Sequence, residues 1–408
     1  MRILYILGQK PGMTGSGVLM KELWKCGETF GDEQRVILAA YPDDDYTEFF
    51  NGYYSSITYS HSDLEGELPF PILGMSDVMP YPSLQYGHAD PSQIEMHIRA
   101  FQDRMENVMS DFNPDIVHIH HLWVLIALAK YCHNILCFVT VHGTELKQLI
   151  TAPQYYQIVK DGIEHIDRFL CVSRDILNDT IRAYKFPLHK AICIGNGYNE
   201  NIFQPEGSIA EIEGNVVVCA GKYVYWKGFH YLIRACGRLS IPHRLVILGT
   251  GSEKTRQMLV QEAIANNMQD KVILTGHVSQ YEVAKWFRRA DVFVLPSIYE
   301  PFGLVLLEAM ACGCPVIASA LGGPKDIISN DLVVDGLATF IHRLDENDQS
   351  DEDRYVSDIH LALAKHLSHD ISPQSRLRIS NSVKGLEWNK VYQLIRAEYV
   401  KALSVRNS

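Results

Sequence analysis

The sequence lacks long apolar runs. It contains no run of about 18 or more consecutive apolar residues, which excludes a membrane-spanning helix of ordinary length. The apolar run at residues 2–7 is too short for the hydrophobic region of a secretory signal peptide, and it ends at Gly8. We therefore expect this run to form a first strand and the protein to be cytoplasmic.

The sequence also lacks paired cysteines. Its nine cysteines include no CxxC pair, and most of them lie in apolar runs such as residues 169–172. The close pair Cys312 and Cys314 has no partners at the spacing of a zinc site. This pattern predicts reduced, buried thiols and no metal centre.

The sequence also has fewer basic than acidic residues. The chain has 37 Lys and Arg against 48 Asp and Glu, a formal net charge of −11. A chain this acidic has no overall attraction for phosphate backbones, so we exclude nucleic acid as a partner. The deficit lies in residues 1–200, with net charge −10 against −1 for residues 201–408, so an anionic ligand is expected in the second half.

The composition is otherwise that of a folded enzyme. Hydrophobic residues make up 47% and charged residues 21% of 408 positions, enough for two domains. Short apolar runs alternate with helical stretches, which predicts an α/β fold of two doubly wound units with parallel sheets. The predicted strands are residues 3–7, 36–40, 116–120, 137–141, 169–172, 192–194, 216–220, 245–248, 272–274, 292–295 and 316–318.

Three segments lack this periodicity. Residues 195–207 are rich in turn-forming residues and are expected to link the two units. Residues 41–92 hold seven tyrosines, and residues 345–353 are strongly acidic. Long loops in compact domains are often functional, so the tyrosines either pack their loop or contact a substrate.

One helix start carries the strongest chemical signal. Glycine and proline positions predict a helix over residues 303–312, whose first amides at Gly303 and Leu304 form an anion site. Glu300 precedes this positive end, and Glu308 lies about 7.5 Å along the helix. A diphosphate on the amides would have a carboxylate near each end, which suits the hydroxyl groups of a nucleotide sugar.

Each glutamate also has a simpler explanation. Glu300 could complement the helix dipole, and Glu308 could be an ordinary helix residue. The residues around Glu308 are apolar on every side, however, so its charge would lie in a buried helix, where an unpaired carboxylate is costly. We therefore favour ligand-binding roles for the two glutamates.

Several histidines lie on or directly after predicted strands. His142 follows residues 137–141, at the strand edge where ligands of α/β proteins bind, although a structural role is the simpler alternative. His118 and His120 should face one side of their strand and His121 the other. The three should not converge on one ion, so no metal site is predicted.

The residues from Glu300 to Glu308, with two glutamates around Pro-Phe-Gly, closely resemble the signature of glycosyltransferase family four, whose members are retaining nucleotide-sugar enzymes of GT-B fold. The resemblance covers nearly the whole chain. Several further segments of the chain resemble other loops of the family. They are Gly15-Ser16-Gly17, His142-Gly143, Gly221-Lys222, Trp226-Lys227-Gly228, Gly249 to Glu253 and Leu321 to Pro324.

The resemblance implies an α/β GT-B fold, with two Rossmann-like doubly wound parallel-sheet domains facing across a cleft. Residues 1–200 would form the acceptor-binding domain, and residues 201–385 the domain that binds the nucleotide sugar. Residues 386–408 show helical spacing and would pack back on the first domain.

The resemblance also implies roles for single residues. Glu308 would bind the ribose hydroxyls, Glu300 the donor sugar and Lys227 the diphosphate. Lys222 stands where an arginine is usual, so phosphate would be held there by a point charge without a bidentate fork. The implied catalytic residues are Glu300, His142 and Lys227. The implied donor-binding residues are Gly17, Lys222, Lys227, Gly303, Leu304, Glu308 and Val278. The acceptor-binding residues are expected to be Gly15, Tyr81 and His142.

The predicted function is retaining sugar transfer from a UDP- or GDP-sugar to a small hydroxylated acceptor such as a sugar, polyol or aminocyclitol. No cofactor or metal is expected, because lysines and helix amides can stabilise the leaving phosphate. A nucleotide-dependent oxidoreductase is one alternative, although its glycine motifs have Met20 and Lys254 at the sixth position. A catalytically silent nucleotide-sugar-binding subunit is another. The sequence specifies no oligomeric state.

Overall fold

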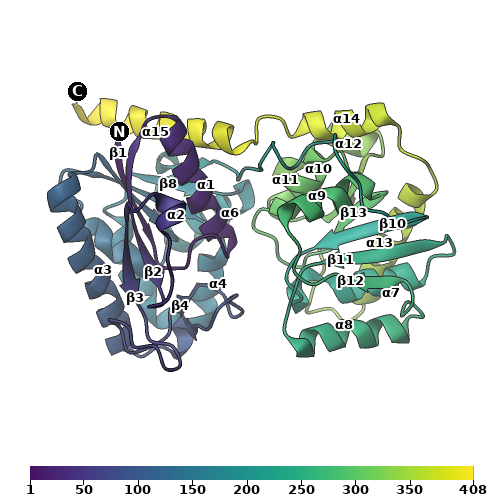
Figure 1. The fold of residues 1–408 in the computed structure, drawn as a ribbon, viewed down its shortest axis with the longest axis horizontal. Coiled ribbons are helices and arrows are strands. Elements are labelled where there is room, and N and C mark those ends of the chain that lie inside the picture. The colour runs from purple at the N-terminus through teal and green to yellow at the C-terminus, as the bar shows by residue number, and fades with distance from the viewer. Residues whose placement is uncertain (408) are drawn as a thin grey trace. The chain divides into compact units, whose positions relative to one another are not determined.

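The computed structural model describes residues 1–407, which form two α/β units (Figure 1). Unit 1 comprises Met1–Asn196 and the described residues from Trp388 onward, and unit 2 comprises Gly197–Glu387. Residues 197–200 and residues 386 and 387 therefore belong to unit 2, outside the bounds predicted for it. No helix within the described residues is long and apolar enough to cross a membrane.

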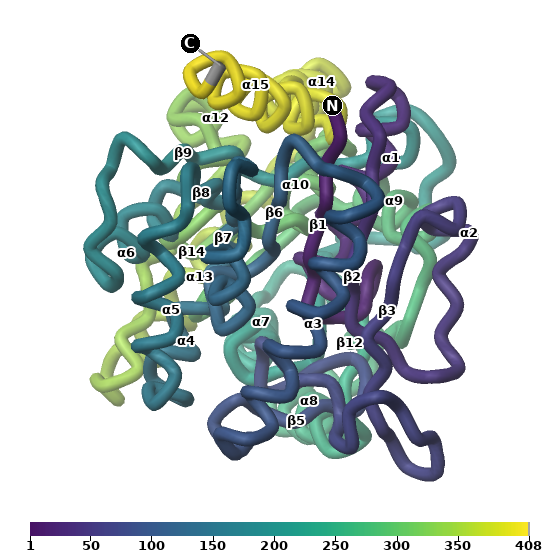
Figure 2. Tube along the Cα trace, turned by 90° about the vertical axis from the view of Figure 1, so that its left-hand side faces the viewer, coloured from purple at the N-terminus to yellow at the C-terminus, as the bar shows by residue number. Residues whose placement is uncertain are grey.

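Unit 1 is built on a parallel sheet. Its strands are β1 (Arg2–Leu7), β2 (Glu33–Ala40), β3 (Tyr54–Thr58), β6 (Ile116–His120), β7 (Leu136–Val141), β8 (Arg168–Cys171) and β9 (Ala191–Cys193), with β4 (Leu73–Gly74) and β5 (Leu84–Gln85) as a separate pair. The strand order is β3-β2-β1-β6-β7-β8-β9, and Figure 2 shows β1, β6, β7 and β8 side by side. β6 and β7 are buried throughout, as expected for strands covered on both faces.

Helices cover both faces of this sheet (Figure 1). The α-helices are α1 (Gly15–Thr29), α2 (Thr47–Phe50), α3 (Pro91–Phe112), α4 (Thr144–Thr151), α5 (Tyr156–Ile163), α6 (Arg174–Tyr184) and α15 (Trp388–Asn407). The 3-10 helices are η1 (Tyr86–His88), η2 (Val124–Tyr131), η3 (Pro153–Tyr155) and η4 (Leu188–Lys190).

The last helix joins unit 1 through a buried carboxylate. α15 packs beside α1 (Figures 1 and 2). Arg396 Nε and Tyr392 Oη each donate a hydrogen bond of 2.8 Å to Asp32 Oδ2, whose side chain is fully buried. Tyr399 Oη lies 2.5 Å from His118 Nδ1 on β6. Polar contacts therefore fix the helix to β6 and to the turn between α1 and β2.

Unit 2 has a second parallel sheet, with the order β12-β11-β10-β13-β14-β15. Its strands are β10 (Asn215–Ala220), β11 (His243–Leu248), β12 (Val272–Leu274), β13 (Val292–Leu295), β14 (Val316–Ser319) and β15 (Ala338–Ile341). Its helices are η5 (Tyr225–Lys227), α7 (Phe229–Gly237), α8 (Glu253–Ala265), α9 (Gln280–Arg289), α10 (Leu304–Ala311), α11 (Pro324–Ile327), α12 (Asn330–Val334), α13 (Asp351–Leu367) and α14 (Pro373–Ser382). Two doubly wound units of this kind confirm the predicted fold class.

The core of unit 2 follows from strand alternation. Val217 and Cys219, two positions apart on β10, belong to one buried cluster with residues of α7 and α13. α9 packs against β10, and α10 packs against β13 and α9. Apolar residues on both faces of the strands are therefore buried, which explains their continuous apolar sequences.

The structure departs from the sequence prediction in several elements. The short strands β4 and β5 were not predicted. β3, at one edge of the first sheet, and β15, at one edge of the second, were not predicted either, because half-buried residues break their apolar pattern. α13 begins at Asp351, inside the acidic run predicted as a loop. Acidic side chains at Asp351, Glu352 and Asp353 occupy its first turn, where they complement the positive end of the helix. The acidic run is therefore in part a helix start.

Candidate active site

Each sheet has one place where its strand order reverses. In unit 2 this place lies between β10 and β13, and in unit 1 it lies between β1 and β6. At such switch points the loops diverge at the carboxyl ends of the strands, where α/β proteins bind ligands. Most of the predicted site residues lie on these loops or in the first turns of the helices that follow them.

In unit 2 the switch point leads to the N-terminus of α10. β13 ends at Leu295, and Gly303 caps the helix with a φ of 95°. Within residues 1–407 no side chain caps this helix. The first amides, at Gly303 and Leu304, therefore remain available to an anion, which the helix dipole also favours.

An ion pair lies directly before this helix. Lys227 Nζ donates to Glu300 Oε2 at 2.6 Å, and Ser297 Oγ donates to the same oxygen at 3.0 Å. Both charged side chains are mostly buried, with 19% of Lys227 and 9% of Glu300 exposed. The structure thus joins two predicted catalytic residues that are far apart in sequence. Ser297 was not predicted from the sequence, because a small polar residue at this place has no distinguishing pattern.

Gly322 brings a further loop against this ion pair. It has a φ of 53°, and a Cβ atom there would lie 1.9 Å from the carbonyl oxygen of Glu300. Only glycine permits such an approach. The loop after β14 therefore supports the backbone of Glu300.

Glu308 is the second predicted carboxylate of α10, and its side chain is half-buried. Burial raises its pKa from 4.5 to about 8, and no hydrogen bond or opposite charge from residues 1–407 offsets that cost. The group is therefore largely protonated at neutral pH. A desolvated carboxyl group without a partner is typical of a ligand-binding position.

The other predicted donor residues of unit 2 lie on neighbouring loops. Lys222 follows β10, and burial together with the charge of Lys227 lowers the pKa of its ammonium group. Val278 follows β12 in a loop whose Gly276 carbonyl accepts a hydrogen bond from Gly249 N at 3.2 Å. Lys222 and Lys227 therefore share one electrostatic environment. Val278 lies on the loop after β12, beside the loop that follows β11.

In unit 1 the loop after β1 leads into α1. Thr14 Oγ1 caps the helix by accepting a hydrogen bond from Gly17 N at 3.1 Å. The amide of Gly17, a predicted donor-binding residue, is thus engaged in the cap. Gly15, a predicted acceptor-binding residue, is exposed at the start of the helix.

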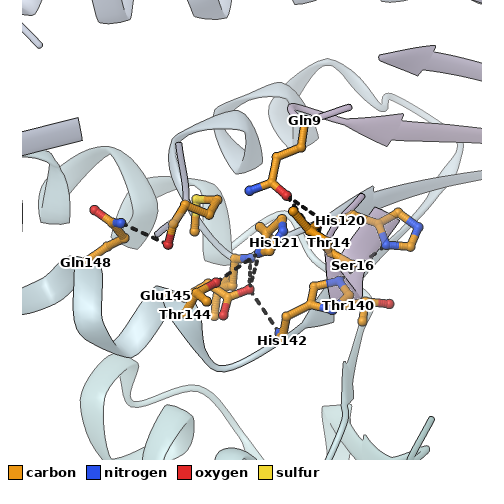
Figure 3. A network of polar contacts seen from close by, with 12 residues as sticks. Gln9, Thr14, Ser16, His120, His121, Thr140, His142, Thr144, Glu145 and Gln148 are labelled. Carbon is orange, nitrogen blue, oxygen red and sulfur yellow. Dashed lines mark hydrogen bonds and ion pairs between the residues drawn. The ribbon is translucent and has the colours of Figure 1, made fainter. Parts of the chain in front are cut away.

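Three histidines of unit 1, His120, His121 and His142, form one buried group (Figure 3). His120 Nδ1 lies 3.4 Å from His142 Nε2, and the ring centroids of His121 and His142 are 4.5 Å apart. The prediction that His121 points away from His120 is therefore wrong. His121 has a φ of 74°, which ends the alternation of the strand. Within residues 1–407 no group of His, Cys, Asp and Glu could hold a metal ion.

His142 is buried at the end of β7. Burial, and then the neighbouring histidine rings, lower its pKa well below the ordinary value. The ring is therefore neutral at physiological pH, and it can donate one hydrogen bond and accept another. It is suited to positioning a hydroxyl group more than to carrying a charge.

Glu145 holds this histidine group together and was not predicted from the sequence. Its Oε1 atom accepts hydrogen bonds from His121 Nδ1 at 3.0 Å, His142 N at 3.0 Å and Leu122 N at 3.3 Å. Glu145 lies in the first turn of α4, where an acidic residue complements the helix dipole. An acidic residue three positions after His142 was the available signal.

Tyr81, a predicted acceptor-binding residue, lies beside the loop after β1. Its hydroxyl accepts a hydrogen bond from Lys10 N at 3.4 Å, and Lys10 Nζ lies 5.7 Å from its ring centroid. Lys10 also pairs with Asp44 at 2.5 Å. None of these contacts involves His142, so the two predicted acceptor residues belong to separate groups of contacts.

Two family models match the chain. Residues 58–201 match Glycosyltransferase Family 4, and residues 203–343 match Glycosyl transferases group 1. Together the two matches cover most of the sequence and include nearly all of the residues discussed for unit 2.

Curated relatives are glycosyltransferases. An uncharacterised glycosyltransferase of Methanocaldococcus jannaschii is 31% identical over 174 residues, which cover 40% of this chain and 45% of that relative. The N-acetyl-alpha-D-glucosaminyl L-malate synthase of Bacillus anthracis is 25% identical over 335 residues, which cover 78% of this chain and 79% of that relative. With three relatives, the matched part spans only 45% to 61% of their own length.

Solved structures share the whole fold. Sucrose-phosphate synthase from Thermosynechococcus elongatus has a TM-score of 0.70 and 19% identity, over 99% of this chain and 100% of that chain. HepE of Anabaena in complex with UDP and glucose has a TM-score of 0.67 and 15% identity, over 98% of this chain and 100% of that chain. Both similarities concern the fold alone.

Proposed function

The chain belongs to glycosyltransferase family four, and from that premise we propose that it transfers a sugar from a nucleoside diphosphate sugar to a small hydroxylated acceptor, with retention of anomeric configuration. The observation that carries the proposal is the mostly buried Lys227–Glu300 pair at the positive end of α10. A fixed cation, a carboxylate and free helix amides meet there at one switch point.

The leaving group determines what unit 2 has to supply. When the bond between the anomeric carbon and the phosphate oxygen breaks, negative charge grows on the diphosphate. Lys227, Lys222 and the amides of Gly303 and Leu304 offer positive charge to it, so no divalent cation is needed. The acceptor oxygen then bonds to the anomeric carbon from the same face, and its proton passes to the departing phosphate.

The two glutamates would bind the two sugars of the donor. Glu300 holds Lys227 in place and can accept hydrogen bonds from hydroxyl groups of the transferred sugar. Glu308 can accept them from the ribose, which would lower its pKa and so favour the charged form. Val278 and Gly17 complete the proposed donor set. UDP-sugars are the first donors to test because HepE, of the same fold, was solved with UDP and glucose.

The acceptor is proposed to bind unit 1, at Gly15, Tyr81 and His142. Neutral His142 can both donate a hydrogen bond to a hydroxyl group and accept one from it. The relative from Bacillus anthracis is named for transfer to L-malate, a small hydroxylated acid. We therefore propose acceptors of this size, with sugars, polyols and aminocyclitols first because unit 1 is strongly acidic.

A donor panel tests the proposal without knowledge of the acceptor. UDP-glucose, UDP-N-acetylglucosamine and GDP-mannose are incubated with the protein in excess EDTA, and release of free nucleoside diphosphate is measured. We expect slow hydrolysis of at least one donor, which is lost in Glu300→Gln. Nucleotide binding without any turnover would favour a silent subunit, and binding of NAD in place of UDP would favour an oxidoreductase.

A further inference from the structure

Unit 1 contains a small cavity at its switch point, lined mostly by apolar atoms. The cavity has a volume of about 10 Å³, which is the size of one water molecule or one hydroxyl group. It lies between the loops that follow β1 and β6. Its lining residues are Gly8, Gln9, Met75, Tyr86, His120, His121, Trp123 and Leu125.

Three ring nitrogens on the lining residues are buried without a partner. They are His120 Nε2, His121 Nε2 and Trp123 Nε1, and no residue among 1–407 forms a hydrogen bond with any of them. His120 is 1% exposed, His121 is 5% exposed and Trp123 is 1% exposed. Buried polar atoms in folded proteins are nearly always hydrogen-bonded, so three such atoms on the lining of one cavity indicate that a water molecule or a hydroxyl group of a ligand occupies it.

The protonation of His121 follows from its contact with Glu145 (Figure 3). Burial acts to raise the pKa of Glu145, but hydrogen bonds from the His121 ring and from His142 N outweigh it, and the pKa is lowered. The carboxylate is therefore charged and can only accept hydrogen bonds. His121 Nδ1 must then carry the proton, so in the neutral ring His121 Nε2 is a bare acceptor.

Donors are present on the same lining. Trp123 Nε1 can only donate. Gln9 Oε1 accepts hydrogen bonds from Ser16 Oγ at 2.9 Å and Thr14 Oγ1 at 3.1 Å. Figure 3 shows the amide nitrogen of Gln9 on the side away from both hydroxyl groups. With the neutral His121 ring, the cavity combines one acceptor with donors, which matches a hydroxyl group.

We propose, on the basis of the glycosyltransferase function, that His121 is an acceptor-binding residue whose Nε2 atom receives a hydrogen bond from a hydroxyl group of the acceptor substrate. Glu145 is the positioning residue that fixes the His121 ring and its tautomer. The ligand class is a neutral hydroxylated molecule that inserts one hydroxyl group into this cavity, or water when the donor is hydrolysed.

A matched pair of variants separates this role from a structural one. His121→Asn keeps a donor at the place of Nδ1, so that the contact with Glu145 can persist, but it lacks Nε2. His121→Gln keeps a polar atom near the place of Nε2 but lacks the donor for Glu145. If His121 had only a structural role, His121→Asn should keep both the melting temperature and the activity closer to the wild type than His121→Gln does.

The kinetic experiment uses the full chain, the best nucleotide sugar of the panel above, myo-inositol and D-glucose as neutral probe acceptors, and L-malate as an anionic comparison. We expect His121→Asn to raise the KM for the acceptor by about three- to tenfold, the loss of one hydrogen bond. Its melting temperature and UDP affinity should match the wild type. If none of the three probes accepts the sugar, the donor hydrolysis rate, with water as acceptor, should fall by the same factor.

Histidine ring ¹⁵N spectra test the part of Glu145. The His121 signals, assigned by their absence in His121→Asn, should show a protonated Nδ1 and a bare Nε2, and Glu145→Gln should remove this fixed tautomer. A protonated Nε2 in the wild type would overturn the inference. So would an unchanged acceptor KM or hydrolysis rate in His121→Asn. Absence of turnover in the wild type would instead refute the proposed function, and the inference with it.

Discussion

The chemistry of the donor site depends on two carboxyl groups, one with hydrogen-bond partners in the protein and one without. Glu300 accepts hydrogen bonds from a lysine and a serine, whereas Glu308 has a pKa raised to about 8 by burial and no partner within residues 1–407. The sequence predicts Glu300 from its place directly before the helix start, and Glu308 from the apolar residues around it in the helix. The sequence could not show that Glu300 forms an ion pair with Lys227.

Proton release should accompany nucleotide binding. At pH 7 Glu308 is mostly protonated, and hydrogen bonds from ribose hydroxyls would lower its pKa, so UDP affinity should rise with pH up to about 8. Calorimetry in buffers of different ionisation enthalpy should show release of nearly one proton. Glu308→Gln is the control, since it should lose this release and bind UDP about 1.5–3 kcal/mol more weakly. Equal proton release in both proteins would contradict the role of Glu308.

Removal of Lys227 should have two separable effects. Lys227→Ala should weaken UDP binding by about 1.5–3 kcal/mol and also lower the melting temperature, because it leaves the mostly buried Glu300 carboxylate without its cation. The double variant Lys227→Ala, Glu300→Gln should regain stability but not affinity. Calorimetry and thermal melting measure the two effects. Recovery of UDP affinity in the double variant would show that Lys227 does not contact the diphosphate.

At the scale of elements, the sequence predicts best where glycine and proline mark a boundary. The bounds of α10 follow from Gly303 and Gly313, and α10 occupies Leu304–Ala311. Edge strand β3 could not be predicted, because Ser55 and Ser56 interrupt its apolar pattern. The direction of His121 could not be predicted either, since a positive φ in a non-glycine residue leaves no mark in the sequence.

The loop after β14 should be essential for the donor site. Gly322→Ala would place a Cβ atom against the carbonyl oxygen of Glu300, so we expect loss of UDP affinity together with a lower melting temperature. Gly214→Ala is a matched control, because Gly214 also has a positive φ but has open space around the position of a Cβ atom. Backbone strain alone would affect both variants equally, with UDP affinity unchanged in each.

At the scale of the whole molecule, two parallel sheets each present their loops at one switch point, and the last helix belongs to unit 1. The alternation of apolar runs predicts this architecture. The contacts of α15 depend on Asp32 and Arg396, which are 364 positions apart and have no shared sequence signal. Such long-range polar pairs are visible only in the structure.

The α15 contact should contribute to the stability of unit 1. Burial acts to raise the pKa of Asp32, but the hydrogen bond from Arg396 and other donors lower it overall, so this stabilisation is present at neutral pH and lost in acid. Arg396→Ala should therefore reduce the free energy of unfolding by about 1–2 kcal/mol at pH 7. Lys401→Ala, which removes an exposed lysine 3.9 Å from Glu398 on the same helix, should change the free energy of unfolding little. Equal effects in denaturant titrations would contradict the account.

The anomeric configuration of the product tests the central proposal most directly. Proton NMR can follow the turnover of UDP-glucose, whose glucose is α-linked, or of the best donor of the panel, in excess EDTA. We predict that the first product formed keeps the anomeric configuration of the donor, and that Glu300→Gln abolishes its formation while UDP affinity stays within about twofold. Formation of the inverted anomer, or activity that requires an added divalent metal, would contradict the account.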